Sequence, residues 1–274
     1  MSDLPGILAG TDWIVDRHLL GTVDHARHYQ HKGEASNLKR EFDAEAMLRK
    51  LIQQIRKNLR EHDPDSVGSS NENWRAEVIK PDLGSANTSK EVLLERKIAQ
   101  ALLKKGEKDW WNQMPIASGL ISVTADRRRA VDLVHRFDPE GSRYDFVELK
   151  VDSDTPVFAL MGILRYGLVY LVLRKEPDWL PEIARGQPVF KAHDVGLRVL
   201  APKDFFEGYD LVWLEARLNE ALPRIIEEQG LESPLIMQVS SHWSPQHTEW
   251  CEAILSDDPR LLSFLSEWEA AFPS

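Results

Sequence analysis

The residues best suited to catalysis or metal binding lie in one short run, Tyr144–Val151. In this run the apolar Val147 and Leu149 alternate with Glu148 and Lys150. Successive side chains of a β-strand point to opposite faces, so the pattern predicts a strand that carries Glu148 and Lys150 on one face. We expect Val147 and Leu149 to face the hydrophobic core.

A second run, Arg129–Phe137, carries Asp132 between two apolar residues in the same alternating pattern. Residues 138–142 (DPEGS) separate the two runs and have the composition of a tight turn. If this turn centres near Glu140, the numbers of paired residues add to about 280. This register places Asp132 directly opposite Glu148, with Cβ atoms roughly 4.5–5.5 Å apart.

Two carboxylates this close repel each other unless a positive charge lies between them. A divalent cation meets this need, because Mg²⁺ is usually held by one or two carboxylates together with phosphate and water. Lys150 adds a second positive charge on the same face. Asp132, Glu148 and Lys150 therefore predict a metal-assisted site for phosphate chemistry. The alternative is a solvent-facing Glu–Lys pair on a half-buried strand, which contributes under ~1 kcal/mol.

The elements that would position these residues follow from hydrophobic periodicity and turn composition. Ser89 is a predicted N-cap for a helix over 90–105. Further helices are expected at 41–61, 156–173, 211–229 (with an interruption at Pro223) and 246–272, the last as one or two closing helices. Strands are expected at 116–123, 129–137, 144–151, 195–200 and 235–239. A crossover helix after three strands predicts an α/β fold, with a mixed sheet covered by helices on both faces.

The polar stretch 62–73 (HDPDSVGSSNEN) is the best candidate for a boundary in the chain. It predicts an N-terminal loop and helical extension over 1–75 and a main domain over 76–274. The core of that domain is expected at about 89–240, with the closing helices behind it.

The apolar run 156–173 is near the minimum length for a membrane span. Arg165 lies at its centre, where a charge costs at least ~2.5 kcal/mol in a bilayer. We therefore expect a buried core helix rather than a membrane helix. The N-terminus has no basic segment followed by an apolar one, and the single cysteine suits a reducing compartment, so a cytoplasmic location is predicted.

The order helix, three strands, helix, strand, with V-D-L at 131–133 and V-E-L-K at 147–150, resembles the PD-(D/E)XK nuclease superfamily. The resemblance implies a restriction endonuclease-like αβββαβ core over roughly the middle of the chain. Carried over by position, Asp132, Glu148 and Lys150 form the strand motif, and Glu95 takes the place of a helical Glu, with Glu91 as the second choice. Asp132, Glu148 and the carbonyl of Leu149 would bind Mg²⁺ or Mn²⁺.

This resemblance implies hydrolysis of a phosphodiester bond in DNA or RNA, with DNA favoured. Metal-activated water would attack, while Lys150 would stabilise the developing negative charge. The run Arg127-Arg128-Arg129 and Arg165 are candidate phosphate contacts. Trp110 and Trp111 could stack on bases, although packing in the core explains them more simply.

The overall charge of the chain limits the kind of nucleic-acid binding to be expected. With 34 Lys and Arg against 44 Asp and Glu, the net charge is −10, which argues against non-specific coating of nucleic acid but not against a local basic groove. Two alternatives stay open. One is a catalytically inactive protein of the same fold that binds a protein partner or a second copy through its N-terminal and C-terminal helices. The other is a metal-dependent hydrolase of a smaller phosphorylated substrate.

Overall fold

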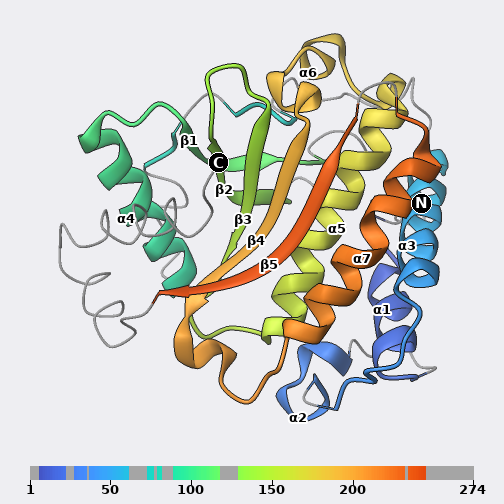
Figure 1. Cartoon of the computed structure of the whole chain (residues 1–274). Coiled ribbons are helices and arrows are strands. Elements are labelled where there is room, and N and C mark those ends of the chain that lie inside the picture. Colours follow the sequence, from blue (N-terminus) through green and yellow to red (C-terminus); the bar gives the residue numbers. More distant parts are fainter. Residues whose placement is uncertain are drawn as a thin grey trace, which may run out of the picture.

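The fold is known from a computed structural model, which describes residues 6–22, 28–35, 37–61, 73–76, 79–81, 89–117, 129–231 and 234–244 of the 274-residue chain. These residues form an α/β structure around one mixed sheet of five strands (Figure 1). The strands are β1 Trp110–Pro115, β2 Ala130–Arg136, β3 Arg143–Leu149, β4 Asp194–Pro202 and β5 Ile236–Ser244.

The strands lie in the sheet in their chain order, β1-β2-β3-β4-β5. β2 is antiparallel to β1 and β3, whereas β3, β4 and β5 run parallel. Leu133 on β2 pairs with Val147 on β3, and Arg136 pairs with Tyr144. Each pair sums to 280, so the register predicted from the turn is confirmed. This register sets which side chains of β2 and β3 stand side by side.

Helices cover both faces of the sheet (Figure 1). α4 lies on one face, α5 and α7 lie on the other, and α1 and α3 pack behind α5 and α7. The helices are α1 Thr11–Leu19, α2 Lys32–Ala35, α3 Ala44–Arg60, α4 Lys90–Lys105, α5 Pro156–Lys175, α6 Glu182–Arg185 and α7 Val212–Gln229. Single turns of 3-10 helix include His28–Gln30 and Pro188–Lys191.

Local sequence signals explain where the site-bearing helices begin. The side chain of Ser89 accepts the N–H of Val92 at the start of α4, and Thr155 accepts that of Phe158 at the start of α5. These side chains satisfy donors that a helix N-terminus leaves unpaired. Gly106 ends α4 in the left-handed conformation that glycine adopts without strain. The boundaries predicted for α4 are therefore confirmed.

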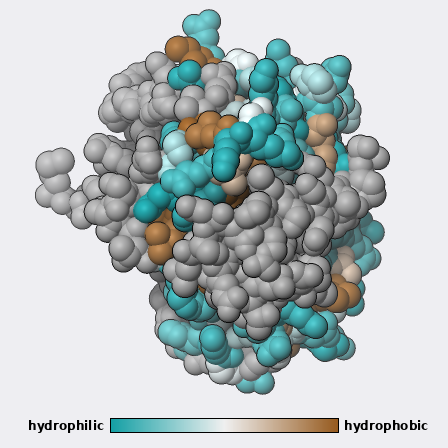
Figure 2. Space-filling view, turned by 90° about the vertical axis from the view of Figure 1, so that its left-hand side faces the viewer, coloured by the Kyte–Doolittle hydropathy of each residue, from teal (hydrophilic) through white to brown (hydrophobic). Residues whose placement is uncertain are grey.

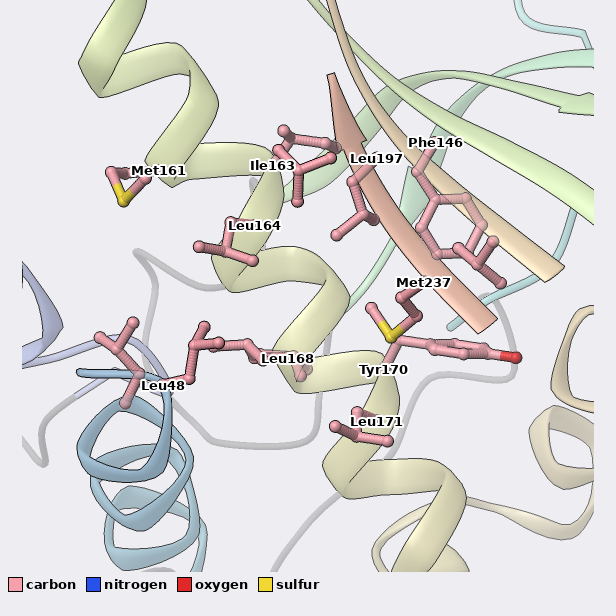
Figure 3. Close-up of a cluster of buried hydrophobic side chains, with 14 of the residues drawn as sticks. Leu48, Phe146, Met161, Ile163, Leu164, Leu168, Tyr170, Leu171, Leu197 and Met237 are labelled. Atoms are coloured by element: carbon pink, nitrogen blue, oxygen red, sulfur yellow. The ribbon is translucent and has the colours of Figure 1, made fainter. Parts of the chain in front are cut away.

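α5 is the central helix of the core (Figure 3). Leu164, Leu168 and Leu171 lie along it, with Leu48 of α3 on one side and Leu197 of β4 on the other. Neighbours on both sides explain why the helix is apolar all round. It is the one helix in the described ranges that is long and apolar enough to span a membrane, and 83% of its apolar window is buried inside the protein. The expectation of a buried core helix is confirmed.

Two expectations about the elements need correction. A strand covers Trp110–Pro115, where none was expected, because the polar pair Asn112-Gln113 interrupts its apolar pattern. The strand expected at 116–123 does not include the described residues 116 and 117 and is otherwise untested. Residues 118–123 lie outside the described ranges. Pro223 does not interrupt its helix, because α7 continues from Val212 to Gln229.

The N-terminal segment shares the hydrophobic core of the sheet. Buried residues of α1 and α3, such as Ile14 and Leu48, belong to the same cluster as Leu164 and Val199. The predicted extension therefore packs against the main domain over its described residues. Most of the predicted linker (62–72) and the closing helices at 246–272 lie outside the described ranges.

The side of the molecule that lies on the left in Figure 1 is mostly hydrophilic where it is described (Figure 2). Brown hydrophobic patches are small and separated by teal residues in this view. The described part of this face therefore presents no continuous apolar surface.

Two glycines of α5 provide a matched test of this packing. A Cβ atom on Gly167 would lie 2.5 Å from Leu197 Cδ1 and 2.8 Å from Met237 Cε, whereas one on Gly162 would meet nothing within 4 Å. We expect Gly167→Ala to lower the free energy of unfolding by about 1–3 kcal/mol through overpacking. Gly162→Ala should leave it unchanged or raise it by up to ~1 kcal/mol. Urea unfolding of both variants measures this, and equal effects would contradict the packing of α5 on β4 and β5.

Candidate active site

The structure brings together the residues that the sequence places on β2 and β3. The paired register ends at Leu133 and Val147, and Asp132 and Glu148 directly follow this pair at one end of the two strands. The charge of Glu148 acts on Asp132, so the two carboxylates lie near each other. Lys150 follows β3, and its Nζ lies 3.2 Å from Glu148 Oε1. The side chains of Glu148 and Lys150 are only 15% and 13% exposed, so they are not a solvent-facing surface pair.

Asp132 is held in place from β3. Its Oδ2 accepts the backbone N–H of Leu149 at 2.8 Å. Burial raises the pKa of Asp132 well above its ordinary value, and the nearby carboxylates of Glu148 and Glu95 raise it further. Burial also raises the pKa of Glu148, although the adjacent Lys150 opposes this effect. Glu148 and Glu95 are thus close enough to disfavour the ionised form of Asp132.

Glu95 joins the site from α4. It is 3% exposed, and its two oxygens accept the side-chain amides of Asn112 and Gln113, each at 2.8 Å. The amide nitrogen of Gln113 is also 3.5 Å from Asp132 Oδ1, so Gln113 links the two acids. Burial raises the pKa of Glu95 to about 7. Glu91, the second choice, instead accepts the backbone N–H of Ser153 at 3.3 Å.

Lys150 is surrounded by carboxylates. Its Nζ lies 3.5 Å from Asp154 Oδ2, in addition to its contact with Glu148. Burial opposes the charged form of Lys150, but Glu148, Asp132 and Asp154 outweigh this effect and raise its pKa. Lys150 is therefore a cation at neutral pH. Gln30 Nε2 donates to the other oxygen of Asp154 at 2.8 Å and so fixes this carboxylate.

Sequence reasoning missed four of these residues: Gln30, Asn112, Gln113 and Asp154. One signal was available, because Asn112 and Gln113 are polar residues between Trp111 and Met114 in a strand whose neighbours are buried. Nothing in the spacing of Gln30 marks it, since it lies 124 residues from its partner.

The structure describes two of the four proposed phosphate-binding arginines, Arg129 and Arg165. Arg127 and Arg128 lie outside the described residues, and Arg129 directly precedes β2. Arg165 is 6% exposed, forms an ion pair with Asp12 of α1 and donates to the backbone oxygen of Met161 at 3.1 Å. In this position Arg165 holds α1 against α5 and does not face a surface ligand.

The donor set at this site suits a hard divalent cation. Asp132, Glu148 and the carbonyl of Leu149 offer oxygen atoms only, which are the ligands that Mg²⁺ prefers. No three His, Cys, Asp or Glu side chains in the described ranges are already gathered as a metal-binding group. Glu148 is engaged by Lys150, and both oxygens of Glu95 are engaged by amides. Ion binding would therefore require side chains to rearrange at this site.

Comparison of the chain with protein-family models, curated proteins and solved structures found no match. The interpretation of this site consequently depends on its own geometry.

Glu95 provides a test of site burial through the pH dependence of stability. Its folded-state pKa of about 7 lies above the ordinary value of 4.5. Because the folded state holds this proton more tightly, the free energy of unfolding should fall as the pH rises from about 4.5 to about 7, by up to ~3 kcal/mol from this group. In divalent-free buffer, Glu95→Gln should flatten that slope.

Glu91, one turn earlier on α4, is the matched control for this measurement. Its pKa is lowered rather than raised, because hydrogen bonds from Ser153 and the charge of Lys150 outweigh its burial. Glu91→Gln should therefore leave the fall between pH 5 and 7 in place. Denaturant unfolding at several pH values measures both variants. A wild-type slope that Glu95→Gln does not change would show that Glu95 is not buried as a carboxyl group.

Proposed function

We propose that this protein is a Mg²⁺- or Mn²⁺-dependent nuclease of the PD-(D/E)XK type. The observation that carries the proposal is the meeting of Asp132, Glu148 and Lys150 at one end of β2 and β3, with Glu95 joined to Asp132 through Gln113. The described element order, from α4 through three antiparallel strands to α5 and the parallel strand β4, also supports it. The finer assignment to a restriction endonuclease-like core is part of the proposal.

In this proposal Asp132, Glu148 and the carbonyl of Leu149 hold the divalent ion. When bound, the ion would lower the pKa of a water molecule and place a positive charge next to a phosphoryl oxygen. Lys150 supplies a fixed positive charge beside Glu148, where negative charge develops during hydrolysis of a phosphodiester. Glu95, with its pKa near neutrality, can hold or release a proton within reach of Asp132. The substrate is a nucleic acid, with DNA favoured over RNA.

One observation favours the alternative of a nuclease fold without catalysis. In the described structure every candidate carboxylate already has a partner within the protein, and no ready metal-binding group is formed. A protein that has kept this network only for stability would look the same. Direct measurement of divalent-ion binding separates the two functions.

Asp132→Asn keeps an oxygen for the Leu149 N–H but removes a negative charge from the site. We expect wild-type protein to bind Mg²⁺ or Mn²⁺ at millimolar concentrations in calorimetry. The variant should lose at least about 100-fold in affinity, more than the loss of an outer hydrogen bond would cost. Asp152→Asn is the control, because Asp152 is exposed and pairs with Lys90. Absence of ion binding in the wild type would favour the inactive alternative.

Lys150→Met keeps most of the aliphatic stem and removes the charge. We expect Mg²⁺-dependent cleavage of labelled single- and double-stranded DNA and RNA to fall by about 10²–10³-fold, as for other groups that stabilise a transition state. Divalent-ion binding should persist in this variant, which also shows that it folds. Lys90→Met serves as the control, since Lys90 lies near the site and is exposed. Unchanged cleavage would remove Lys150 from the mechanism.

A further inference from the structure

A cavity of about 420 Å³ lies between the end of α5, the end of α7 and the segment that leads into β4. Four basic side chains line it: Arg174 and Lys175 from the last turn of α5, and Lys191 and His193 from the segment before β4. The other described lining residues are Pro177, Phe190 and Leu231, so no described carboxylate contributes to its walls. In a chain with a net charge of −10, this cavity is a local concentration of positive charge.

The two basic residues of α5 are fixed by contacts with oxygen atoms. Arg174 Nη1 donates to the backbone oxygen of Ala192 and, at 2.9 Å, to the hydroxyl of Tyr170. Lys175 Nζ donates to the backbone oxygen of Gly230 at 2.9 Å, where α7 ends. These bonds hold the three segments around the cavity together. Because all of these acceptors are neutral, the bonds position both cations without neutralising their charge.

The other two basic residues reach the cavity from one wall. Lys191 and His193 flank Ala192, whose φ of −58° and ψ of 140° describe extended backbone. In extended backbone, residues two positions apart point to the same side. Ala192 is fully buried, whereas Lys191 and His193 are both exposed. A ligand in the cavity can therefore approach both side chains directly.

Nearby carboxylates contact other cations. Glu176, which follows α5, pairs with Arg56 at 2.5 Å. Asp194, the first residue of β4, lies 3.8 Å from Arg143. Within the described part of the chain, the four basic side chains of the cavity form no ion pair. A hollow lined by one sign of charge concentrates ions of the opposite sign, so the cavity attracts anions from solution.

We propose that this cavity is a binding site for a ligand that carries two neighbouring phosphate groups. Guanidinium and ammonium groups are the side chains that bind phosphate in proteins. A phosphomonoester carries about −1.5 to −2 at neutral pH, so one such group leaves part of the charge of Arg174, Lys175 and Lys191 unmatched. Two phosphates match these three cations. The volume of about 420 Å³ lies within the ~300–1,000 Å³ of small-molecule sites, so it also admits the organic group that bears the phosphates.

The cavity lies at the opposite end of the sheet from the candidate active site (Figure 1). β4 begins beside the start of β3, where Asp194 pairs with Arg143, whereas the acidic site lies at the other end of β3. From Asp194 to Leu200, the partner of Leu149, β4 rises about 20 Å at ~3.3 Å per residue. The anion site is therefore separate from the acidic site and independent of the proposed nuclease function.

The binding test uses the full-length protein, freed of divalent ions by dialysis so that the acidic site holds no metal. Calorimetric titration near physiological ionic strength compares inorganic pyrophosphate with orthophosphate. We expect pyrophosphate to saturate a single site and to bind at least about tenfold more tightly, because its second phosphate makes further charge-assisted hydrogen bonds. Equal affinity for both anions, or no saturable binding of pyrophosphate at millimolar concentration, would overturn the proposal.

A matched pair of charge reversals assigns the binding to the cavity. Lys191→Glu and Lys104→Glu change the net charge equally and replace exposed lysines, but Lys104 lies on α4, on the other face of the sheet. Lys191→Glu should weaken pyrophosphate binding by about tenfold or more, and Lys191→Ala by about threefold, since both remove a nearby positive charge. Lys104→Glu should change it by less than about twofold, because salt screens exposed charges that lie farther than a Debye length from the ligand.

Unfolding curves establish that each variant is folded. An affinity for pyrophosphate that neither Lys191 variant changes would place the anion elsewhere and overturn the assignment. Equal losses in Lys191→Glu and Lys104→Glu would show only an effect of net charge and would overturn it as well.

A labelled single-stranded oligonucleotide distinguishes the two sources of neighbouring phosphates. If the phosphates belong to a nucleic-acid backbone, the oligonucleotide should displace pyrophosphate, and Lys191→Glu should weaken the binding of both. If they belong to a small phosphorylated molecule, Lys191→Glu should weaken pyrophosphate binding alone. Either result supports the anion site and names its source. Divalent-ion binding at Asp132 is measured separately, so failure of the anion site and failure of the proposed nuclease are distinguishable.

Discussion

One constraint determines the rest of this site: several carboxylates lie close together where they are largely shielded from water. Asp132 and Glu148 lie near each other because both directly follow the last pair of the β2–β3 register, Leu133 and Val147. Burial raises the pKa of both acids, and the charge of Glu148 raises that of Asp132 further, so nearby donors must offset this cost. The Leu149 N–H supports Asp132, and the Lys150 ammonium supports Glu148. Asn112 and Gln113 complete the set by donating to Glu95, so amides and one cation keep the acids close together.

Backbone strain is concentrated at the same places. Three non-glycine residues in the described ranges have positive φ: Gln113 at 51°, Asp154 at 63° and Trp74 at 58°. Gln113 bridges Glu95 and Asp132, Asp154 contacts Lys150, and Trp74 packs against Phe146 and Tyr170 in the core. Such conformations cost on the order of 1–3 kcal/mol each and persist only where surrounding contacts impose them. Two of the three strained residues therefore belong to the network that holds Asp132 and Lys150 in place.

Hydrophobic alternation, turn composition and capping residues predicted those parts of the structure that depend on residues close together in sequence. The alternation around Glu148 and the turn at 138–142 were enough to predict the register, because pairing across a short turn depends only on residues near it in sequence. Capping by Ser89 likewise defined α4 from a few neighbouring residues. The strand at Trp110–Pro115 was not predicted, because Asn112 and Gln113 donate to Glu95 and break the apolar pattern. Contacts of Gln30 and Arg165 depend on how distant segments pack, which periodicity does not encode.

The N-terminal segment is accordingly part of what positions the candidate active site. The backbone oxygen of Tyr29 accepts the Thr155 hydroxyl at 2.7 Å, and Thr155 caps the start of α5. The next residue, Gln30, holds Asp154, which in turn contacts Lys150. A single turn of 3-10 helix thereby fixes both the first turn of the core helix and the carboxylate beside the lysine. Because Lys150 is shared between Glu148 and Asp154, the orientation set by Gln30 bears directly on where its positive charge lies. The candidate active site on β2 and β3 thus depends on Tyr29 and Gln30. The sequence assigns both residues to the N-terminal extension rather than to the main domain.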